Sequence, residues 1–99
     1  MPLPIELPMD EIRELCAKYD VKELALFGSV LRPDFREDSD VDVLVDFDED
    51  TALGLMGFAR LARELGELLH RQVDLVPKDG LKRRIRRPVL ESAQVIYER

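Results

Sequence analysis

Two short apolar runs, separated by a polar loop, constrain the fold of this chain more than any other part of it. The first run, Glu23 to Phe27, stops at Gly28-Ser29, and the second, Asp40 to Phe47, begins after ten more residues. Each run is shorter than a typical helix and ends at turn-forming residues, which predicts two strands. Side chains alternate between the two faces of a strand, so Asp40 and Asp42 share one face.

The shared face of Asp40 and Asp42 indicates a cation site. Two neighbouring carboxylates repel each other, and a divalent cation between them relieves that repulsion. Gly28 and Ser29 add features that suit a phosphate: close backbone approach, a hydroxyl, and N–H groups at a helix start. Together these features indicate a site for a metal–nucleoside triphosphate. The acidic pair alone is a weak signal in a chain with 21 acidic residues, because such pairs are usually solvated.

The periodicity of the chain predicts an α/β domain, with a mixed sheet of three or four strands and helices on one side. A helix between the second and third strands is a crossover, which places the third strand parallel to the second. The other expected elements are a helix over about residues 9–19, a helical turn over Ser29 to Arg32, a long helix over Thr51 to Leu69, a third strand over Gln72 to Val76, short helical segments over Leu81 to Arg86 and Val89 to Ser92 separated by Pro88, and an edge strand over Ala93 to Tyr97.

A third carboxylate, Asp74, stands in the middle of the third expected strand. An aspartate within a strand is unfavourable, and its burial costs desolvation energy unless it has a partner. A metal ion shared with Asp40 and Asp42 would supply that partner. Asp40, Asp42 and Asp74 are therefore the candidate metal ligands.

Length, charge and cysteine content argue against several other classes of protein. The 99 residues fit one domain over 1–99, and the single Cys16, expected on the packed face of the first helix, has no partner for an intramolecular disulfide. No apolar run approaches the roughly 20 residues that span a bilayer, and no signal peptide is evident, so a cytoplasmic location is expected. Nine acidic residues and one arginine between Asp34 and Asp50 argue against direct nucleic-acid binding.

The combined motif resembles the nucleotidyltransferase superfamily related to DNA polymerase beta, and its minimal nucleotidyltransferase (MNT) branch in particular. Gly28-Ser29, Asp40 and Asp42 match the family pattern, within Leu-Phe-Gly-Ser-Val-Leu-Arg and Asp-Ser-Asp-Val-Asp-Val-Leu-Val. Val-Asp-Leu-Val and the C-terminal Ala-Gln-Val-Ile-Tyr extend the resemblance to about residues 10–97. One departure is Pro33, where the family usually has glycine; it puts substrate fit rather than the chemistry in question.

The resemblance implies a palm-like core and two-metal nucleotidyl transfer. In that mechanism Asp40 and Asp42 hold the Mg²⁺ that carries ATP, and the Gly28-Ser29 turn holds the β and γ phosphates. Asp74 helps to bind a second Mg²⁺, which lowers the pKa of the attacking hydroxyl. Attack at the α-phosphate then releases pyrophosphate.

Arg32 is a further candidate ligand of the triphosphate, because it lies about one helical turn beyond Gly28-Ser29. An ion pair with Asp34 or Glu37 on the surface is an equally good interpretation of the sequence.

The sequence itself does not indicate the acceptor. MNT proteins are typically encoded beside a HEPN-domain protein in a toxin–antitoxin pair, so the resemblance implies AMP transfer from ATP to a HEPN-type toxin protein. Two alternatives stay open: an antitoxin that neutralises its partner by contact alone, and a small-molecule nucleotidyltransferase that acts as a dimer. The basic residues between Lys82 and Arg87 are a candidate docking surface.

Overall fold

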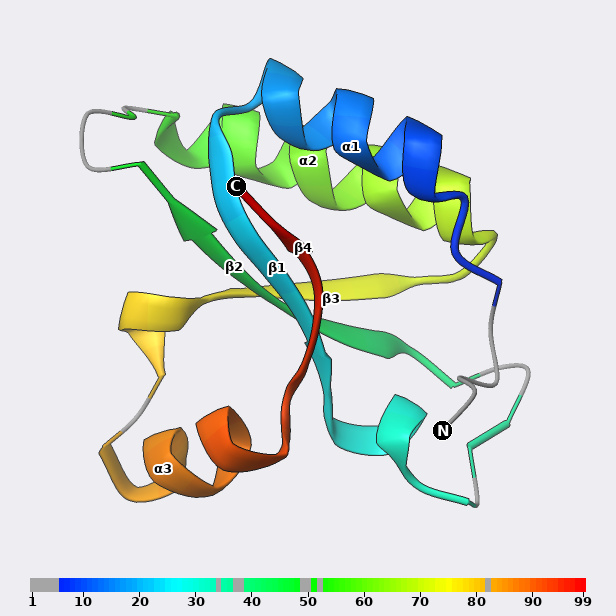
Figure 1. Ribbon diagram of the computed structural model, residues 1–99, viewed down its shortest axis with the longest axis vertical. Coiled ribbons are helices and arrows are strands. Elements are labelled where there is room, and N and C mark those ends of the chain that lie inside the picture. The colour runs from blue at the N-terminus through cyan, green and yellow to red at the C-terminus, as the bar shows by residue number, and fades with distance from the viewer. Residues whose placement is uncertain (1–5, 34, 37–38, 49–50, 52, 82) are drawn as a thin grey trace.

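The computed structural model describes residues 6–33, 35–36, 39–48, 51, 53–81 and 83–99. These residues form three α-helices, four strands and two short 3-10 helices (Figure 1). They are α1 (Met9–Lys18), β1 (Val21–Phe27), η1 (Gly28–Leu31), β2 (Val41–Phe47), α2 (Gly54–Leu69), β3 (Val73–Pro77), η2 (Lys78–Gly80), α3 (Arg83–Ser92) and β4 (Gln94–Glu98).

The four strands form one mixed sheet in the order β3-β2-β1-β4. Strand β1 is antiparallel to both of its neighbours, whereas β2 and β3 are parallel. The parallel pair follows from the α2 crossover, so the predicted α/β class and the predicted crossover are confirmed. The expected C-terminal edge strand is confirmed as β4.

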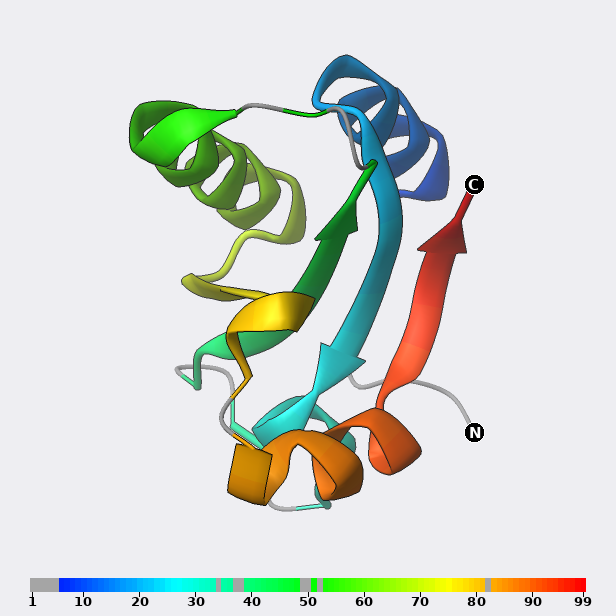
Figure 2. The ribbon, with the colours of Figure 1, turned by 90° about the vertical axis from the view of Figure 1, so that its left-hand side faces the viewer.

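The main hydrophobic core lies between one face of the sheet and the helices α1 and α2, which run next to each other (Figures 1 and 2). Ile12 and Cys16 of α1, Leu61 of α2 and Val43 of β2 are all at most 1% exposed. Full burial of each large aliphatic side chain contributes about 1.5–3 kcal/mol relative to exposure. No described helix is both long and apolar enough to cross a membrane.

The opposite face of the sheet is covered in part by the segment that contains α3. Leu44 of β2 and Ala25 of β1 form a second, smaller core with Leu81, packed against Val89 of α3 and Ala93. The prediction that all helices lie on one side of the sheet was therefore wrong for α3. The physical reason is alternation: Leu44 points away from the α1–α2 face, and it needs apolar cover of its own.

Helix α3 runs through Pro88 without interruption. The prediction of two helical segments separated by this proline was wrong. Proline removes one intrahelical hydrogen bond. The hydrogen bonding continues on its C-terminal side, where the Ser92 hydroxyl donates to the Pro88 carbonyl at 2.9 Å and the Ala93 N–H donates to the Val89 carbonyl at 2.8 Å.

Candidate functional site

The candidate site begins at Gly28, where β1 ends and η1 begins. Gly28 has a φ of +73°, a left-handed conformation that residues with a Cβ rarely adopt. A Cβ placed on Gly28 would lie 3.2 Å from Cγ of Asp42 and would overlap its Oδ2 atom. Glycine is thus required at this position for two reasons: the left-handed turn and the close approach of the Asp42 carboxylate.

Asp42 is held between the two strands that flank β2. Its Cα pairs with Phe27 of β1 on one side and with Asp74 of β3 on the other. Paired residues on neighbouring strands project to the same face, so the Asp42 and Asp74 side chains share a face. The sheet register thereby brings together two of the three predicted carboxylates, which are separated by a whole helix in the sequence.

The electrostatic surroundings of Asp42 raise the pKa of its carboxyl group. Burial is the largest cause, and the negative charges of Asp74 and Asp40 act in the same direction. A hydrogen bond from the Ser29 backbone and the positive charge of Arg32 act in the opposite direction. Asp74 and Asp40 are therefore close enough to destabilise the charged form of Asp42, and a cation at this position would relieve that cost.

The residues present fit a magnesium ion that is shared with a nucleotide. Carboxylate oxygens are the donors that Mg²⁺ prefers, and it is usually bound by one or two carboxylates together with substrate phosphates. Among the described residues, however, no group of three or more His, Cys, Asp or Glu side chains is placed so that it could hold a metal ion, so the metal site of Asp40, Asp42 and Asp74 stays a prediction. Asp42, which is half-buried, would form the protein part of such a site together with Asp40 and Asp74, which are exposed.

Ser29 connects the glycine turn to the start of β2. Its hydroxyl donates a hydrogen bond of 3.2 Å to the backbone carbonyl of Asp40, in addition to the backbone hydrogen bond to Asp42. The role expected from the sequence, phosphate binding by Gly28 and Ser29, stays a prediction. The structure adds a second role for Ser29, which is to fix the position of both aspartates.

Arg32 is exposed, and its charge is close enough to lower the pKa of Asp42. The alternative ion-pair partners, Asp34 and Glu37, lie outside the described residues. A triphosphate contact therefore stays a prediction for Arg32, whose charge acts on the Asp42 carboxylate.

Sequence reasoning missed Arg71, which follows α2. Its guanidinium carbon lies 4.7 Å from the centre of the Phe35 ring, and Nη1 donates a hydrogen bond of 3.1 Å to the Arg36 carbonyl. No periodicity or short motif links positions 35 residues apart, so nothing in the sequence pattern indicated this contact.

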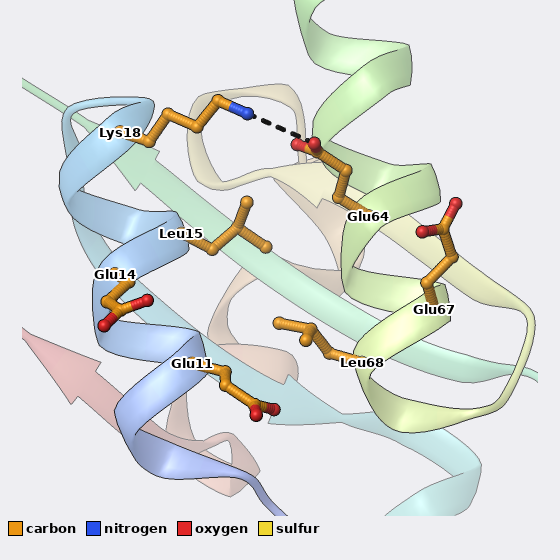
Figure 3. Close-up of a pocket in the computed structure, with 7 residues that line it drawn as sticks. All are labelled: Glu11, Glu14, Leu15, Lys18, Glu64, Glu67 and Leu68. Atoms are coloured by element: carbon orange, nitrogen blue, oxygen red, sulfur yellow. Dashed lines mark hydrogen bonds and ion pairs between the residues drawn. The ribbon is translucent and has the colours of Figure 1, made fainter.

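A groove of about 340 Å³ lies between α1 and α2 (Figure 3). Val41 and Val43 of β2 belong to the core beneath these helices, so alternation places Asp42 on the opposite face of the sheet. The walls of the groove are Glu11, Glu14, Leu15, Lys18, Glu64, Glu67 and Leu68. Lys18 Nζ and Glu64 Oε1 form an ion pair of 3.2 Å across it. Because the groove contains none of the predicted site residues, we place the candidate site at the Gly28–Asp42–Asp74 end of the sheet.

Comparison with known proteins shows the family to which the chain belongs. A model of the nucleotidyltransferase domain matches residues 9–96. The chain belongs to this family. Its relatives include the protein adenylyltransferase MntA of Thermococcus cleftensis, which is 44% identical over 85 residues, or 86% of this chain and 82% of MntA. The predicted membership of the nucleotidyltransferases and the predicted enzyme class are confirmed.

Solved structures agree with the fold. A protein designated a minimal nucleotidyltransferase is 39% identical, with a TM-score of 0.70 over 90% of this chain and 87% of the other. A toxin–antitoxin structure with AMP-PNP is 22% identical, with a TM-score of 0.73 over 94% of this chain and 75% of the other. At that identity the second likeness shows the shared fold alone.

Proposed function

We propose that this nucleotidyltransferase transfers AMP from ATP to a hydroxyl group of a HEPN-type toxin protein, for which it acts as the antitoxin. The main support is the pairing of Asp42 with Asp74 on adjacent parallel strands, directly beside the glycine turn. The identity of 44% to a protein adenylyltransferase supports a protein as the acceptor. The toxin–antitoxin structures among its fold neighbours support the kind of partner.

The proposed reaction is a displacement at the α-phosphate of ATP. The acceptor hydroxyl releases its proton to solvent, its oxygen forms a bond to the α-phosphorus, the bond from that phosphorus to the β-phosphate oxygen breaks, and pyrophosphate leaves. Mg²⁺, of which we expect two ions, would neutralise phosphate charge and lower the pKa of the acceptor hydroxyl when bound. Catalysis of this type rests mainly on positioning and on charge neutralisation.

Different side chains would bind the triphosphate, its cation and the acceptor. Asp40 and Asp42 would hold the cation that accompanies the triphosphate, while the Gly28-Ser29 turn and Arg32 bind the phosphates. Asp74 is more exposed than Asp42, so an acceptor hydroxyl can reach it from solvent. Asp74 would therefore hold the ion that serves the acceptor.

An antitoxin that acts by contact alone is the second candidate function. The observation that favours it is the exposed basic surface of α3, formed by Arg84, Arg86 and Arg87, of which Arg87 donates to Glu91 at 3.1 Å. Lys82 lies outside the described residues. Contact alone would require no carboxylate beside the glycine turn, and this favours the enzyme.

Copurification with the HEPN-type partner, followed by intact mass measurement with and without ATP and Mg²⁺, tests the proposal. We expect the mass of the partner to rise by one or more AMP groups only when both are present. The Asp40→Asn/Asp42→Asn double variant should form the same complex and yield no adduct. A stable complex of the wild-type chains without any adduct would instead favour the contact-only antitoxin.

Charge reversal tests the docking surface separately from the chemistry. Arg84→Glu combined with Arg87→Glu should weaken the complex and leave Mg-ATP affinity unchanged, because both residues lie outside the carboxylate site. Arg13→Glu, a charge reversal at an exposed arginine of α1, is the control. An adduct that forms equally well with the α3 variant would exclude this docking surface.

A further inference from the structure

The segment that leads into Asp40 is attached to the residues that follow α2. The Arg71 guanidinium lies over the Phe35 ring at 4.7 Å and donates to the Arg36 carbonyl at 3.1 Å. Next to Arg71, the backbone carbonyl of Gln72 accepts a hydrogen bond of 2.9 Å from the Val41 N–H. Contacts from two consecutive residues thus hold the segment before Asp40 and the residue after it.

The point at which Arg71 binds is connected to Asp40 by short hydrogen bonds. The Arg36 N–H donates to the Ser39 hydroxyl at 3.2 Å, and the Ser39 N–H donates back to the Arg36 carbonyl at 3.1 Å. The Arg36 carbonyl therefore accepts from both Ser39 and Arg71. A shift of Arg36 would move Ser39, and with it the adjacent Asp40.

Arg71 is itself held by the end of α2. Its N–H donates to the Gly66 carbonyl at 3.0 Å, and His70, at a φ of +55°, turns the chain into the left-handed conformation that ends the helix. A Cβ on Gly66 would lie 2.8 Å from the Arg71 carbonyl. The end of α2 thus fixes the backbone position from which the Arg71 side chain extends.

We infer that Arg71 is a positioning residue, which holds Asp40 where it can contribute to cation binding; this rests on the proposed function. Arginine suits the task because a planar guanidinium stacks on an aromatic ring and donates hydrogen bonds at the same time. Lysine offers a single compact charge and cannot do both with the same geometry. Phe35 in turn is half-buried and packs against the main core.

Binding of Mn²⁺ and AMP-PNP to the full chain, measured by calorimetry, tests the inference without any turnover. Arg71→Met should raise the Mn²⁺ concentration needed for half-saturation by about tenfold, the usual scale for loss of a residue that orients a metal ligand. Arg71→Lys should fall between Arg71→Met and the wild type. Arg63→Met is the control, because Arg63 is an exposed arginine of α2 whose ion pair is with Glu67, at 3.9 Å.

Hydrogen exchange of the peptide that spans residues 33–41 provides a second readout. We expect faster exchange there in Arg71→Met, with unchanged exchange in β1. Should Arg71→Met fail to fold, Phe35→Leu removes the ring contact while it keeps an apolar side chain, and the same two changes are expected. Wild-type Mn²⁺ affinity in these variants would overturn the positioning role. Failure of the wild-type chain itself to bind Mn²⁺ and AMP-PNP would overturn the proposed function and this inference together.

Discussion

Replacement of Gly28 by alanine separates the two reasons for glycine at that position. Gly28 and Gly54 have the same φ of +73°, but only Gly28 has a neighbour: a Cβ at Gly54 would meet nothing within 4 Å. Gly54→Ala is therefore a matched control, which introduces the same backbone strain without a clash.

The expected magnitudes follow from these two geometries. An alanine in the left-handed region costs about 1–2 kcal/mol, so Gly54→Ala should lose about that much unfolding free energy. In Gly28→Ala the new methyl group also overlaps the Asp42 carboxylate, and overpacking adds about 1–3 kcal/mol. The total expected loss of unfolding free energy for Gly28→Ala is then about 2–5 kcal/mol. The loss is smaller if the Asp42 side chain rotates away and relieves the overlap.

Relief by rotation has a functional consequence, because it removes the Asp42 carboxylate from its hydrogen bond with Ser29. We expect Mg-ATP affinity, measured by calorimetry, to fall at least about tenfold in Gly28→Ala, whereas Gly54→Ala should keep wild-type affinity. Urea unfolding measures the stability difference between the two variants. Wild-type Mg-ATP affinity in a folded Gly28→Ala protein would refute the placement of the nucleotide site at Asp42.

Three further predictions concern single side chains. Asp74→Asn should keep appreciable Mg-ATP binding but lose AMP transfer; a loss of binding as large as in the Asp40→Asn/Asp42→Asn variant would contradict separate roles. Burial raises the pKa of the Cys16 thiol from 9.0 to about 12. As the pH rises, the thiol therefore ionises in the unfolded chain before it ionises in the folded protein, and the free energy of unfolding falls above pH 9. Relative to Cys16→Ala, wild-type unfolding free energy should fall by about 1.4 kcal/mol between pH 8 and 10, and parallel pH profiles would argue against this. Leu61→Ala should cost about 2–5 kcal/mol in urea unfolding, whereas Leu55→Ala, at an 85% exposed position, should change it by less than about 0.5 kcal/mol.

The local features of the site could be predicted because they depend on neighbours in the sequence. Alternation along β2 places Asp42 opposite the valines, and the α2 crossover requires β3 to run parallel to β2. From those two facts Asp74 was expected near Asp42, and the register of the two strands confirms it. The strand and helix boundaries also follow local signals, with shifts of one to three residues, as at the start of α2, expected at Thr51 and found at Gly54.

The features that could not be predicted depend on packing between distant parts of the chain. Leu44 is buried, but the sequence does not indicate which segment covers it. The charges of α3 predict a solvated helix face, but they do not indicate on which side of the sheet the helix packs. The contact of Arg71 with Phe35 is of the same kind. It arises only because α2 ends beside the loop before β2, and no local pattern records that proximity.

The position of α3 bears on how a partner could reach the carboxylates. Leu44, which this segment of the chain covers, follows Asp42 by two residues and projects to the same face of the sheet. The row of Phe27, Asp42 and Asp74 is thus separated from the row beneath α3 by only about 7 Å, the length of two residues in a strand. A protein bound to the basic surface of α3 would therefore approach from the side on which the carboxylates lie, whereas one bound in the α1–α2 groove would lie behind the sheet. If AMP is transferred to a protein acceptor, charge reversal on α3 should reduce the rate of transfer, whereas charge reversal at Glu11 and Glu14 should not. The opposite result would place the acceptor on the α1–α2 face of the sheet, away from the carboxylates, and would contradict the proposed site.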